Sequence, residues 1–329
     1  MQRTLGRSGI KTGAIGLGCW AIGGPFFMHG KPDGWGGVDD AESIRAIEVA
    51  IELGANLIDT ADAYGTGHSE RVIGRAVANR RPEVAIATKF GFTYDETTKA
   101  LGEIDISPDY IRRACKASLE RLRTSYIDLY QIHPGEMPFD QIERAAETLE
   151  KLCEEGSIRF WGWSTDNAAA AARLVNYPHF TAVQQELSVF RDGPGVISLC
   201  EAENLASLNR SPLAMGMLTG KFSASTVLST DDVRGAGHDW VRDFANGRPT
   251  AEALAKLDAI RELLQTGGRT LAQGALGWIL ARSPKTIPIP GFKSEAQVRD
   301  NLGALEKGPL PKDVMDEIAR VLPDRAQAA

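Results

Sequence analysis

Four side chains that could take part in acid–base chemistry follow apolar stretches in the first half of the chain. Asp59 directly follows Leu57-Ile58, and Tyr64 comes five residues later. Lys89 ends the stretch VAIATK at 84–89, and His133 ends IDLYQIH at 127–133. An apolar run that stops at a polar residue is typical of a buried strand that opens onto a functional site. A buried carboxylate needs a positive partner, so we expect Asp59 to pair with Lys89.

This pairing predicts a proton-delivery site. A lysine ammonium beside a phenol favours the phenolate, so we expect Lys89 to lower the pKa of Tyr64 from its reference of about 10. Tyr64 would donate a proton to a carbonyl oxygen, and His133 would hold that oxygen by a hydrogen bond. The carbonyl carbon also needs a hydride, which no side chain supplies. The residues therefore imply a nicotinamide cofactor.

Each of these residues also has a purely structural interpretation when it is taken alone. Asp59 could cap a turn, Lys89 could be a surface lysine, and His133 could be a hydrogen-bonded histidine of the core. Four such residues close to neighbouring strand ends favour a shared site. The interpretation therefore depends on the elements that would bring them together.

Eight strand-like segments alternate with helical periodicity along the chain. They lie near residues 14, 56, 84, 127, 158, 183, 206 and 286, and a polar stretch without periodicity, 218–249, interrupts the pattern. This alternation predicts an α/β protein with a single (β/α)8 TIM barrel, preceded by a β-hairpin within residues 3–18 and ending in a C-terminal cofactor-binding segment. We expect one domain over residues 1–329. The carboxyl ends of all strands would then meet at one mouth.

Composition excludes several classes of function. The 329 residues are 43% hydrophobic and carry a net charge of −6 without a long basic run, which gives no footprint for nucleic acid or an anionic membrane. The four cysteines form no C-x-x-C pair, so neither a metal site nor a disulfide scaffold is expected. No signal peptide or membrane span is visible, which favours a cytoplasmic protein. The oligomeric state cannot be read from the sequence.

Nearly the whole chain resembles the aldo-keto reductase family. The matching segments are GLGCW at 16–20, IDTADAYGTGHSE at 58–70, TKFG at 88–91, the strand ending in His133, GWST at 162–165, VQQE at 183–186, SPLAMGMLTGKF at 211–222 and IPIPGFKSEAQVRDNLGAL at 287–305. The resemblance implies a catalytic tetrad of Asp59, Tyr64, Lys89 and His133. It also implies NADPH, with NADH less favoured, bound without a Rossmann fold.

The resemblance further implies a set of residues along the cofactor. Ser164 and Gln184 would hold the nicotinamide carboxamide. The complete set of implied cofactor-binding residues is Trp20, Asp59, Ser164, Gln184, Arg210, Ser211, Leu213, Gly216, Lys221, Gly291, Lys293, Gln297 and Asn301. Lys293 and Ser294 also begin a predicted helix, whose amino end attracts phosphate. A capping box formed by Ser294 and Gln297 would explain these two residues without a ligand.

Three positions depart from the family pattern. Thr165 stands where many members have Asn, Leu187 where the strand often carries Tyr, and Arg210 where an aromatic side chain commonly stacks on the nicotinamide. The guanidinium of Arg210 can still stack or pair with a phosphate or a substrate oxygen. Because of these departures, the resemblance does not identify the small carbonyl substrate. A polar, sugar-derived aldehyde is one candidate. Aromatic residues of the predicted mouth loops could wall its pocket, namely Trp20, Phe26, Phe27, Trp35 and Trp240.

Two other functions compete with an NADPH-dependent reductase. A redox-sensing or regulatory subunit would keep the barrel and the cofactor but turn over little, and no interaction tail is visible for it. A (β/α)8 lyase or isomerase would use Lys89 as a Schiff base, which the expected pairing with Asp59 disfavours.

Overall fold

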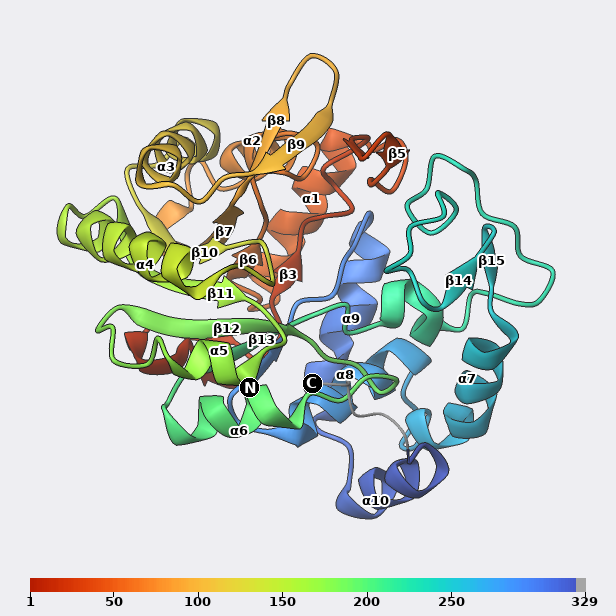
Figure 1. Cartoon of the computed structure of the whole chain (residues 1–329). Coiled ribbons are helices and arrows are strands. Elements are labelled where there is room, and N and C mark those ends of the chain that lie inside the picture. The colour runs from red at the N-terminus through yellow and green to blue at the C-terminus, as the bar shows by residue number, and fades with distance from the viewer. Residues whose placement is uncertain (324–329) are drawn as a thin grey trace.

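A curved sheet of eight parallel strands forms the centre of the computed structural model, and helices surround it (Figure 1). The structure describes residues 1–323; the last six residues of the expected domain 1–329 lie outside the described residues. The sheet closes where Gly16 N–H donates to Pro288 O at 2.9 Å and Gly18 N–H to Pro290 O at 3.0 Å. The predicted (β/α)8 barrel is therefore confirmed. Its strands are β3 (Leu17–Gly18), β6 (Leu57–Asp59), β7 (Ala85–Phe90), β10 (Ile127–Ile132), β11 (Ile158–Ser164), β12 (Phe180–Glu186), β13 (Ala206–Arg210) and β16 (Thr286–Pro288).

Several helices begin at a capping residue that the sequence supplies. The side chains of Asp39, Ser107 and Thr250 accept backbone N–H groups of the first turns of α1, α3 and α7, and Thr270 forms a capping box with Gln273 at α8. The last helix, α10, was not predicted from the sequence. The helices are α1 (Asp40–Glu52), α2 (His68–Ala76), α3 (Pro108–Leu122), α4 (Phe139–Glu154), α5 (Ala168–Ala172), α6 (Pro194–Ala202), α7 (Ala251–Leu264), α8 (Leu271–Arg282), α9 (Glu295–Lys307) and α10 (Lys312–Val321).

Two hydrophobic layers hold the barrel together. A small cluster, which includes Leu57, Ala87, Leu129, Leu208 and Ile287, joins side chains from six of the barrel strands. A much larger cluster packs the other faces of the strands against the helices. Burial on both faces explains why these strands read as continuous apolar runs rather than as an alternating pattern.

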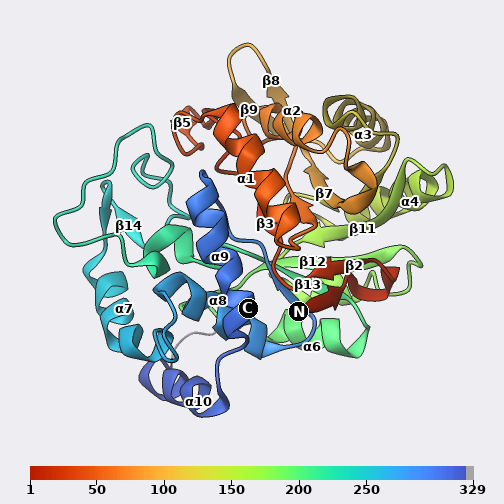
Figure 2. The same ribbon diagram turned by 180° about the vertical axis from the view of Figure 1, so that it is seen from behind.

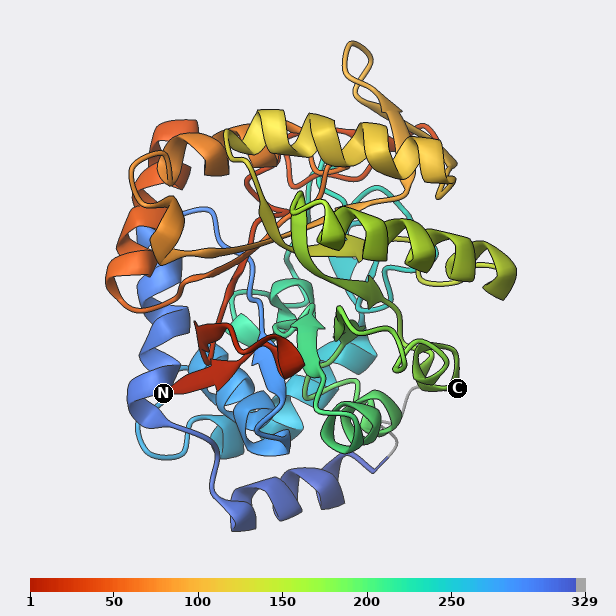
Figure 3. The same cartoon turned by 90° about the vertical axis from the view of Figure 1, so that its left-hand side faces the viewer.

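The predicted N-terminal hairpin is present and lies against one end of the barrel. Strand β1 (Gln2–Thr4) pairs antiparallel with β2 (Lys11–Gly13), and Figure 3 shows this hairpin in front of the strands. Between them, Ser8 N–H donates to Thr181 Oγ1 at 3.1 Å. Gly6 has φ +53°, and a Cβ there would lie 2.2 Å from Thr181 O, so only glycine fits this contact. The opposite end of the barrel is left for the site.

Short elements that the sequence did not predict surround that opposite end. Strand β8 (Phe92–Asp95) pairs with β9 (Ala100–Ile104), which also adjoins the small hairpin of β4 (Phe27–Met28) and β5 (Lys31–Pro32). The interrupting stretch, 218–249, contains the antiparallel pair of β14 (Phe244–Ala245) and β15 (Arg248–Pro249). Figure 2 shows β14 near α7.

Two loops meet across the mouth. Val233 N–H donates to Gly34 O at 2.8 Å, Trp35 and Asp232 form an antiparallel bridge, and Lys31 Nζ reaches Gly237 O at 2.6 Å. These bonds join the loop after β5 to the interrupting stretch. Among residues 1–323, no helix has both the length and the apolar character that crossing a membrane requires.

Candidate active site

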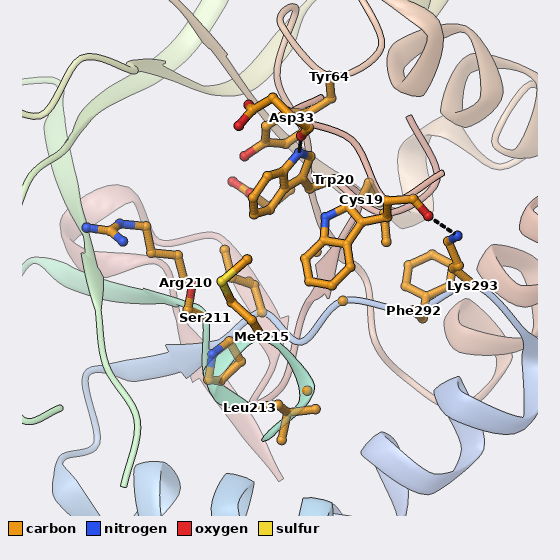
Figure 4. A pocket seen from close by; sticks show the side chains of 18 of the residues that line it. Cys19, Trp20, Asp33, Tyr64, Arg210, Ser211, Leu213, Met215, Phe292 and Lys293 are labelled. Carbon is orange, nitrogen blue, oxygen red and sulfur yellow. Dashed lines mark hydrogen bonds between the residues drawn. The ribbon is translucent and has the colours of Figure 1, made fainter. Parts of the chain in front are cut away.

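A cavity of about 670 Å³ lies at the carboxyl ends of the barrel strands. It is lined by Asp59, Tyr64 and His133 and by every side chain or backbone position that the sequence implied for the cofactor. Lys89 is fully buried and lies beneath this lining. The structure therefore brings together the residues of the predicted site, although they come from eight different parts of the chain. Figure 4 shows ten of the lining residues labelled around the cavity.

The predicted pair of Asp59 and Lys89 is formed. Lys89 Nζ lies 2.7 Å from Asp59 Oδ2, and it also donates to Thr60 O at 2.8 Å and to the Tyr64 hydroxyl at 3.3 Å. The ammonium thus has three oxygen partners, which satisfies its three donors. The register of the sheet sets this geometry, because Asp59 is paired with Ala87 on the neighbouring strand, two residues before Lys89.

Two glutamines hold the other oxygen of the carboxylate. Gln184 Nε2 donates to Asp59 Oδ1 at 2.8 Å, and Gln131 Nε2 donates to the same atom at 3.2 Å. Gln131 was not recognised in the sequence, although it lies two residues before His133 on β10. The carboxylate is therefore fixed on both oxygens, and its direction sets the position of the lysine ammonium.

The pKa shifts around the Asp59–Lys89 pair differ from the expectation at Tyr64. Burial opposes the charge of Lys89, but Asp59 and Tyr64 outweigh this effect and raise the pKa of Lys89, so that it stays an ammonium. Burial also raises the pKa of Tyr64, and this effect exceeds the opposite effect of the Lys89 charge. The prediction of a lowered Tyr64 pKa is therefore wrong for this structure. The phenol keeps its proton at neutral pH and can serve as a donor.

His133 faces Tyr64 edge to face, with ring centroids 5.7 Å apart. Burial, followed by the charges of Lys89 and Arg210, holds the pKa of His133 well below its ordinary value. The ring is therefore neutral at pH 7. Its Nδ1 is buried and has no hydrogen-bond partner among residues 1–323. A neutral imidazole can donate one hydrogen bond into the cavity without repelling the nearby lysine.

One end of the cavity is suited to an anion. Ser211, Ala214 and Met215 adopt positive φ, and Gly216 has φ +92°, so this short turn is held in a strained conformation of the kind found at ligand sites. Lys221 lies beside the turn and has no ion-pair or hydrogen-bond partner in the described part of the chain. Burial and then the neighbouring Arg234 lower the pKa of Lys221, because charges of one sign are crowded there.

The start of α9 completes this anion-binding end. Ser294 accepts Gln297 N–H at 3.4 Å, whereas the Gln297 side chain accepts Lys293 N–H at 2.7 Å rather than the N–H of Ser294. The proposed capping box is thus only half formed. Lys293 Nζ donates to Trp35 O at 2.5 Å and to Gly37 O at 3.2 Å, so it has no carboxylate partner within the described residues. Asn301 Nδ2 donates to Gly291 O at 3.4 Å.

Arg210 lines the cavity but already has two acidic partners. Its guanidinium lies 2.5 Å from Asp166 and 3.7 Å from Glu186. The other two departures from the family pattern are internal: Thr165 Oγ1 donates to Gly135 O at 2.8 Å, and Leu187 is fully buried. The expected stacking or phosphate contact of Arg210 therefore competes with a formed ion pair, a fact that the sequence did not reveal.

Several lining residues carry no clear signal in the sequence, because they lie in loops without periodicity or in the short strands β4, β8 and β9. Arg234, which pairs with Asp232 at 2.6 Å, lies in the polar stretch 218–249, for which the sequence predicts no element. Of the five aromatic residues expected at the mouth, only Phe27 does not line the cavity. The signal that could have found the missed residues is the density of aromatic and charged residues in these loops. The missed lining residues include Met28, Asp33, Phe92, Leu101, Met215, Asp232, Arg234 and Phe292.

Known proteins resemble this chain along nearly its whole length. A family model described as the aldo/keto reductase family matches residues 14–323. The aldo-keto reductase yakc [NADP(+)] of Schizosaccharomyces pombe is 32% identical over 305 residues, which cover 89% of this chain and 84% of that protein.

Solved structures share the fold. A glycerol dehydrogenase from Gluconobacter oxydans has a TM-score of 0.78 and 30% identity, covering 97% of this chain and 95% of its own. An aldo/keto reductase from Klebsiella pneumoniae in complex with NADP and acetate has a TM-score of 0.72 and 25% identity, covering 99% and 97%.

Proposed function

The chain belongs to the aldo/keto reductase family, and we propose that it reduces the carbonyl group of a small aldehyde or ketone with NADPH, using Tyr64 as the general acid. The observation that carries this proposal is the position of Lys89 Nζ, 2.7 Å from Asp59 and 3.3 Å from the Tyr64 hydroxyl, beneath the cavity. A phenol beside a fixed ammonium can release a proton and remain stabilised as phenolate.

The four residues of the tetrad have separate tasks. NADPH, when bound, supplies the hydride that forms the new C–H bond, while the π electrons of the carbonyl move to oxygen. Tyr64 gives its proton to that oxygen and becomes a phenolate beside Lys89. Asp59 keeps Lys89 charged and in place. His133 donates a hydrogen bond to the same oxygen as it gains charge, and solvent later returns the proton to Tyr64.

The anion-binding end of the cavity fits the phosphates of NADPH. Lys221 and Lys293 lack carboxylate partners in the described part of the chain, and burial is the largest cause that lowers both lysine pKa values. A bound anion would offset the cost of burying these two charged side chains. The residues that would hold the cofactor are Ser164 and Gln184 at the carboxamide, Ser211, Leu213, Gly216 and Lys221 at the pyrophosphate, Gly291, Lys293, Gln297 and Asn301 at the adenosine end, and Trp20, Asp59 and Arg210 along the wall.

A polar aldehyde, such as a sugar-derived one, is the substrate class that we propose. The name of the Gluconobacter oxydans neighbour contains a polyol, and the cavity combines aromatic walls with charged groups. We further propose that residues 1–329 form one domain that acts in the cytoplasm, which the four free cysteines support.

A direct assay tests the proposed reaction. Purified protein is mixed with NADPH and a panel of aldehydes, and the absorbance of the reduced nicotinamide is followed. We expect steady loss of absorbance that depends on the aldehyde. The alternative of a redox-sensing or regulatory subunit predicts cofactor binding without this turnover. Absence of nicotinamide binding would contradict both functions.

The alternative of a Schiff-base lyase or isomerase conflicts with the electrostatics of Lys89. A Schiff base forms from the neutral amine, which needs a lowered lysine pKa. Asp59 and Tyr64 instead raise the pKa of Lys89 above its ordinary value, despite its burial. Treatment with borohydride in the presence of an aldehyde should therefore leave the mass of the peptide that contains Lys89 unchanged.

The raised pKa of Tyr64 predicts the pH dependence of the reaction. The protonated phenol is the active form of a general acid, so activity is present below the Tyr64 pKa and is lost as the pH rises through it. Because this pKa lies above about 10, the reference value of tyrosine, we expect kcat for reduction to stay nearly constant between about pH 6 and pH 9. A steady decline of kcat across this range would indicate the lowered pKa that the sequence suggested.

Replacing Lys293 by methionine is expected to reduce the preference for NADPH over NADH by about tenfold, since a charge-assisted bond contributes about 1.5 kcal/mol or more. Lys293 lies one residue before the cap of α9, where its charge adds to that of the helix amino end. The measurement is kcat/KM for both cofactors at one fixed aldehyde concentration.

The ratio of kcat/KM for NADPH to that for NADH separates recognition of the cofactor phosphate from support of the loop. Lys293 also holds the loop after β5 through Trp35 O and Gly37 O, and loss of that support would weaken both cofactors alike. Lys116→Met, which removes an exposed lysine of α3, is the matched control. An unchanged ratio in Lys293→Met would remove Lys293 from phosphate recognition.

A further inference from the structure

Asp33 is held rigidly in the wall of the cavity by its backbone. Its N–H donates to Phe26 O at 2.9 Å, and its carbonyl oxygen accepts Trp20 Nε1–H at 3.0 Å. The residue follows β5 and is only 7% exposed, yet it lines the cavity. Figure 4 shows its side chain among those of Trp20 and Tyr64. The loop therefore presents a carboxyl group beside the aromatic wall.

This carboxyl group has no hydrogen-bond partner within the described residues. Its Oδ1 is buried and unpaired, and no described residue donates to the other oxygen. His238 Nε2 lies 3.5 Å from Oδ1, but it also lies 2.8 Å from Pro32 O, which can accept its hydrogen. Burial raises the pKa of Asp33 to about 7. Apart from His238, no described residue places a polar side chain against this carboxyl group, so the packing leaves its hydrogen-bonding capacity unused.

The surroundings of Asp33 link it to the proposed reaction centre. The ring of Trp20 stacks on Tyr64 with centroids 6.0 Å apart and an interplanar angle of 25°. The ring centroid of Trp240 lies 6.0 Å from that of Trp20, and the ring centroid of His238 lies 5.3 Å from that of Trp240. Flat apolar faces beside one polar group are typical of a pocket that orients a small polar molecule.

We propose that Asp33 forms a hydrogen-bonding subsite for a hydroxyl group on the carbon chain of the substrate, so that the enzyme prefers hydroxylated aldehydes to alkyl aldehydes of equal length. This inference rests on the proposed carbonyl reduction and adds the residue that selects the substrate. The aromatic faces would pack against the C–H groups of the same molecule, and Asp33 would take up the hydroxyl.

A hydroxyl group fits Asp33 better than a cationic group. It can donate to the carboxylate and can accept from the protonated carboxyl, so it binds in either state. An ammonium group needs the charged state alone, and it would also enter a cavity lined by Arg210, Arg234, Lys221 and Lys293. The lining also contains Asp59, Asp232 and Asp300, but Asp59 is paired with Lys89 and Asp232 with Arg234. Lys221 and Lys293 have no carboxylate partner among the described residues, so their charges oppose a cation.

The test compares two aldehydes of three carbons, glyceraldehyde and propanal, with NADPH as the reductant. The quantity measured is the ratio of their kcat/KM values, corrected for the hydrated fraction of each aldehyde. We expect this ratio to fall about tenfold in Asp33→Ala and about twofold to threefold in Asp33→Asn, whose amide oxygen still accepts a hydrogen bond. Asp33→Leu, which replaces the carboxyl group by an apolar branch of similar size, is the second variant should the alanine variant fail to fold. Asp239→Ala removes an exposed carboxylate from the facing loop and should leave the ratio unchanged.

The outcomes separate this inference from the reaction on which it rests. Wild-type protein that oxidises NADPH with neither aldehyde would overturn the proposed reduction and the subsite with it. Wild-type protein that reduces both, with the same ratio in Asp33→Ala and Asp33→Leu, would overturn the subsite alone. A third aldehyde, 3-aminopropanal, tests the choice of ligand. Its selective loss in Asp33→Ala, with glyceraldehyde unaffected relative to propanal, would assign Asp33 to a cation and contradict the proposal.

Discussion

Replacing Tyr64 by phenylalanine is expected to lower kcat for aldehyde reduction by about 10²-fold to 10⁴-fold, the usual contribution of a positioned general acid. The phenol is the only donor within hydrogen-bonding distance of Lys89 Nζ that could pass a proton to the substrate and leave a stabilised anion, as far as the described residues show. The phenylalanine ring preserves the stacking on Trp20, so the wall of the cavity should remain. Steady-state rates with NADPH and a good aldehyde give the measurement.

The control for this change is another tyrosine. Tyr126 packs its ring beneath the guanidinium of Arg81, with 3.9 Å between the guanidinium carbon and the ring centroid, and does not line the cavity. Tyr126→Phe should keep the wild-type rate. NADPH binding, followed by fluorescence quenching, should be retained in Tyr64→Phe. If Tyr64→Phe reduces aldehydes as fast as wild type, the proton comes from another group and the proposed mechanism is wrong.

Replacing Lys89 by methionine is expected to affect both stability and rate. The change leaves the carboxylate of Asp59, which is 2% exposed, without its charged partner. Breaking a buried pair on one side costs about 3–5 kcal/mol of the free energy of unfolding. The phenolate left by Tyr64 would also lose its ammonium, so kcat should fall by about 10²-fold or more. Urea unfolding and steady-state rates measure the two effects separately.

A second substitution separates these two effects. Adding Asp59→Asn to Lys89→Met removes the unpaired charge, and Gln131 and Gln184 can reorient their amides toward the new side chain. We expect the double variant to regain most of the lost stability and none of the lost rate. Equal stability of the single and double variants would show that the unpaired carboxylate is not the source of the destabilisation.

The sequence predicted the tetrad as a group because each member stands on or next to an apolar strand. A short buried strand is recognisable from its composition, and parallel strands of a barrel must end at one mouth. Residue order alone therefore placed Asp59, Lys89 and His133 together. Gln131 escaped notice, although it lies on β10, because a buried amide within an apolar run carries no signal until its partner is known.

The loop residues could not be predicted in the same way. Asp33 lies in a glycine-rich segment without periodicity. Its position depends on hydrogen bonds of its backbone to Trp20 and Phe26, and no local sequence pattern indicates these bonds. The sequence predicts no helix or strand in the stretch 218–249, and the structure has the end of a 3-10 helix and two short strands there. Arg210 was identified as a departure, but its pairing with Asp166 spans 44 residues.

The sequence by itself determined the alternation of eight strands with helices, the barrel that follows from it, and the partner of Asp59, because these depend on local composition and on chain order. Only the tertiary structure decided the sign of the Tyr64 pKa shift. That sign is a balance between the depth of burial and the distance to Lys89, and neither quantity is written in the residue order. The unpaired carboxyl of Asp33 is likewise a property of the folded cavity, since a partner is absent only once all neighbours within the described residues are placed.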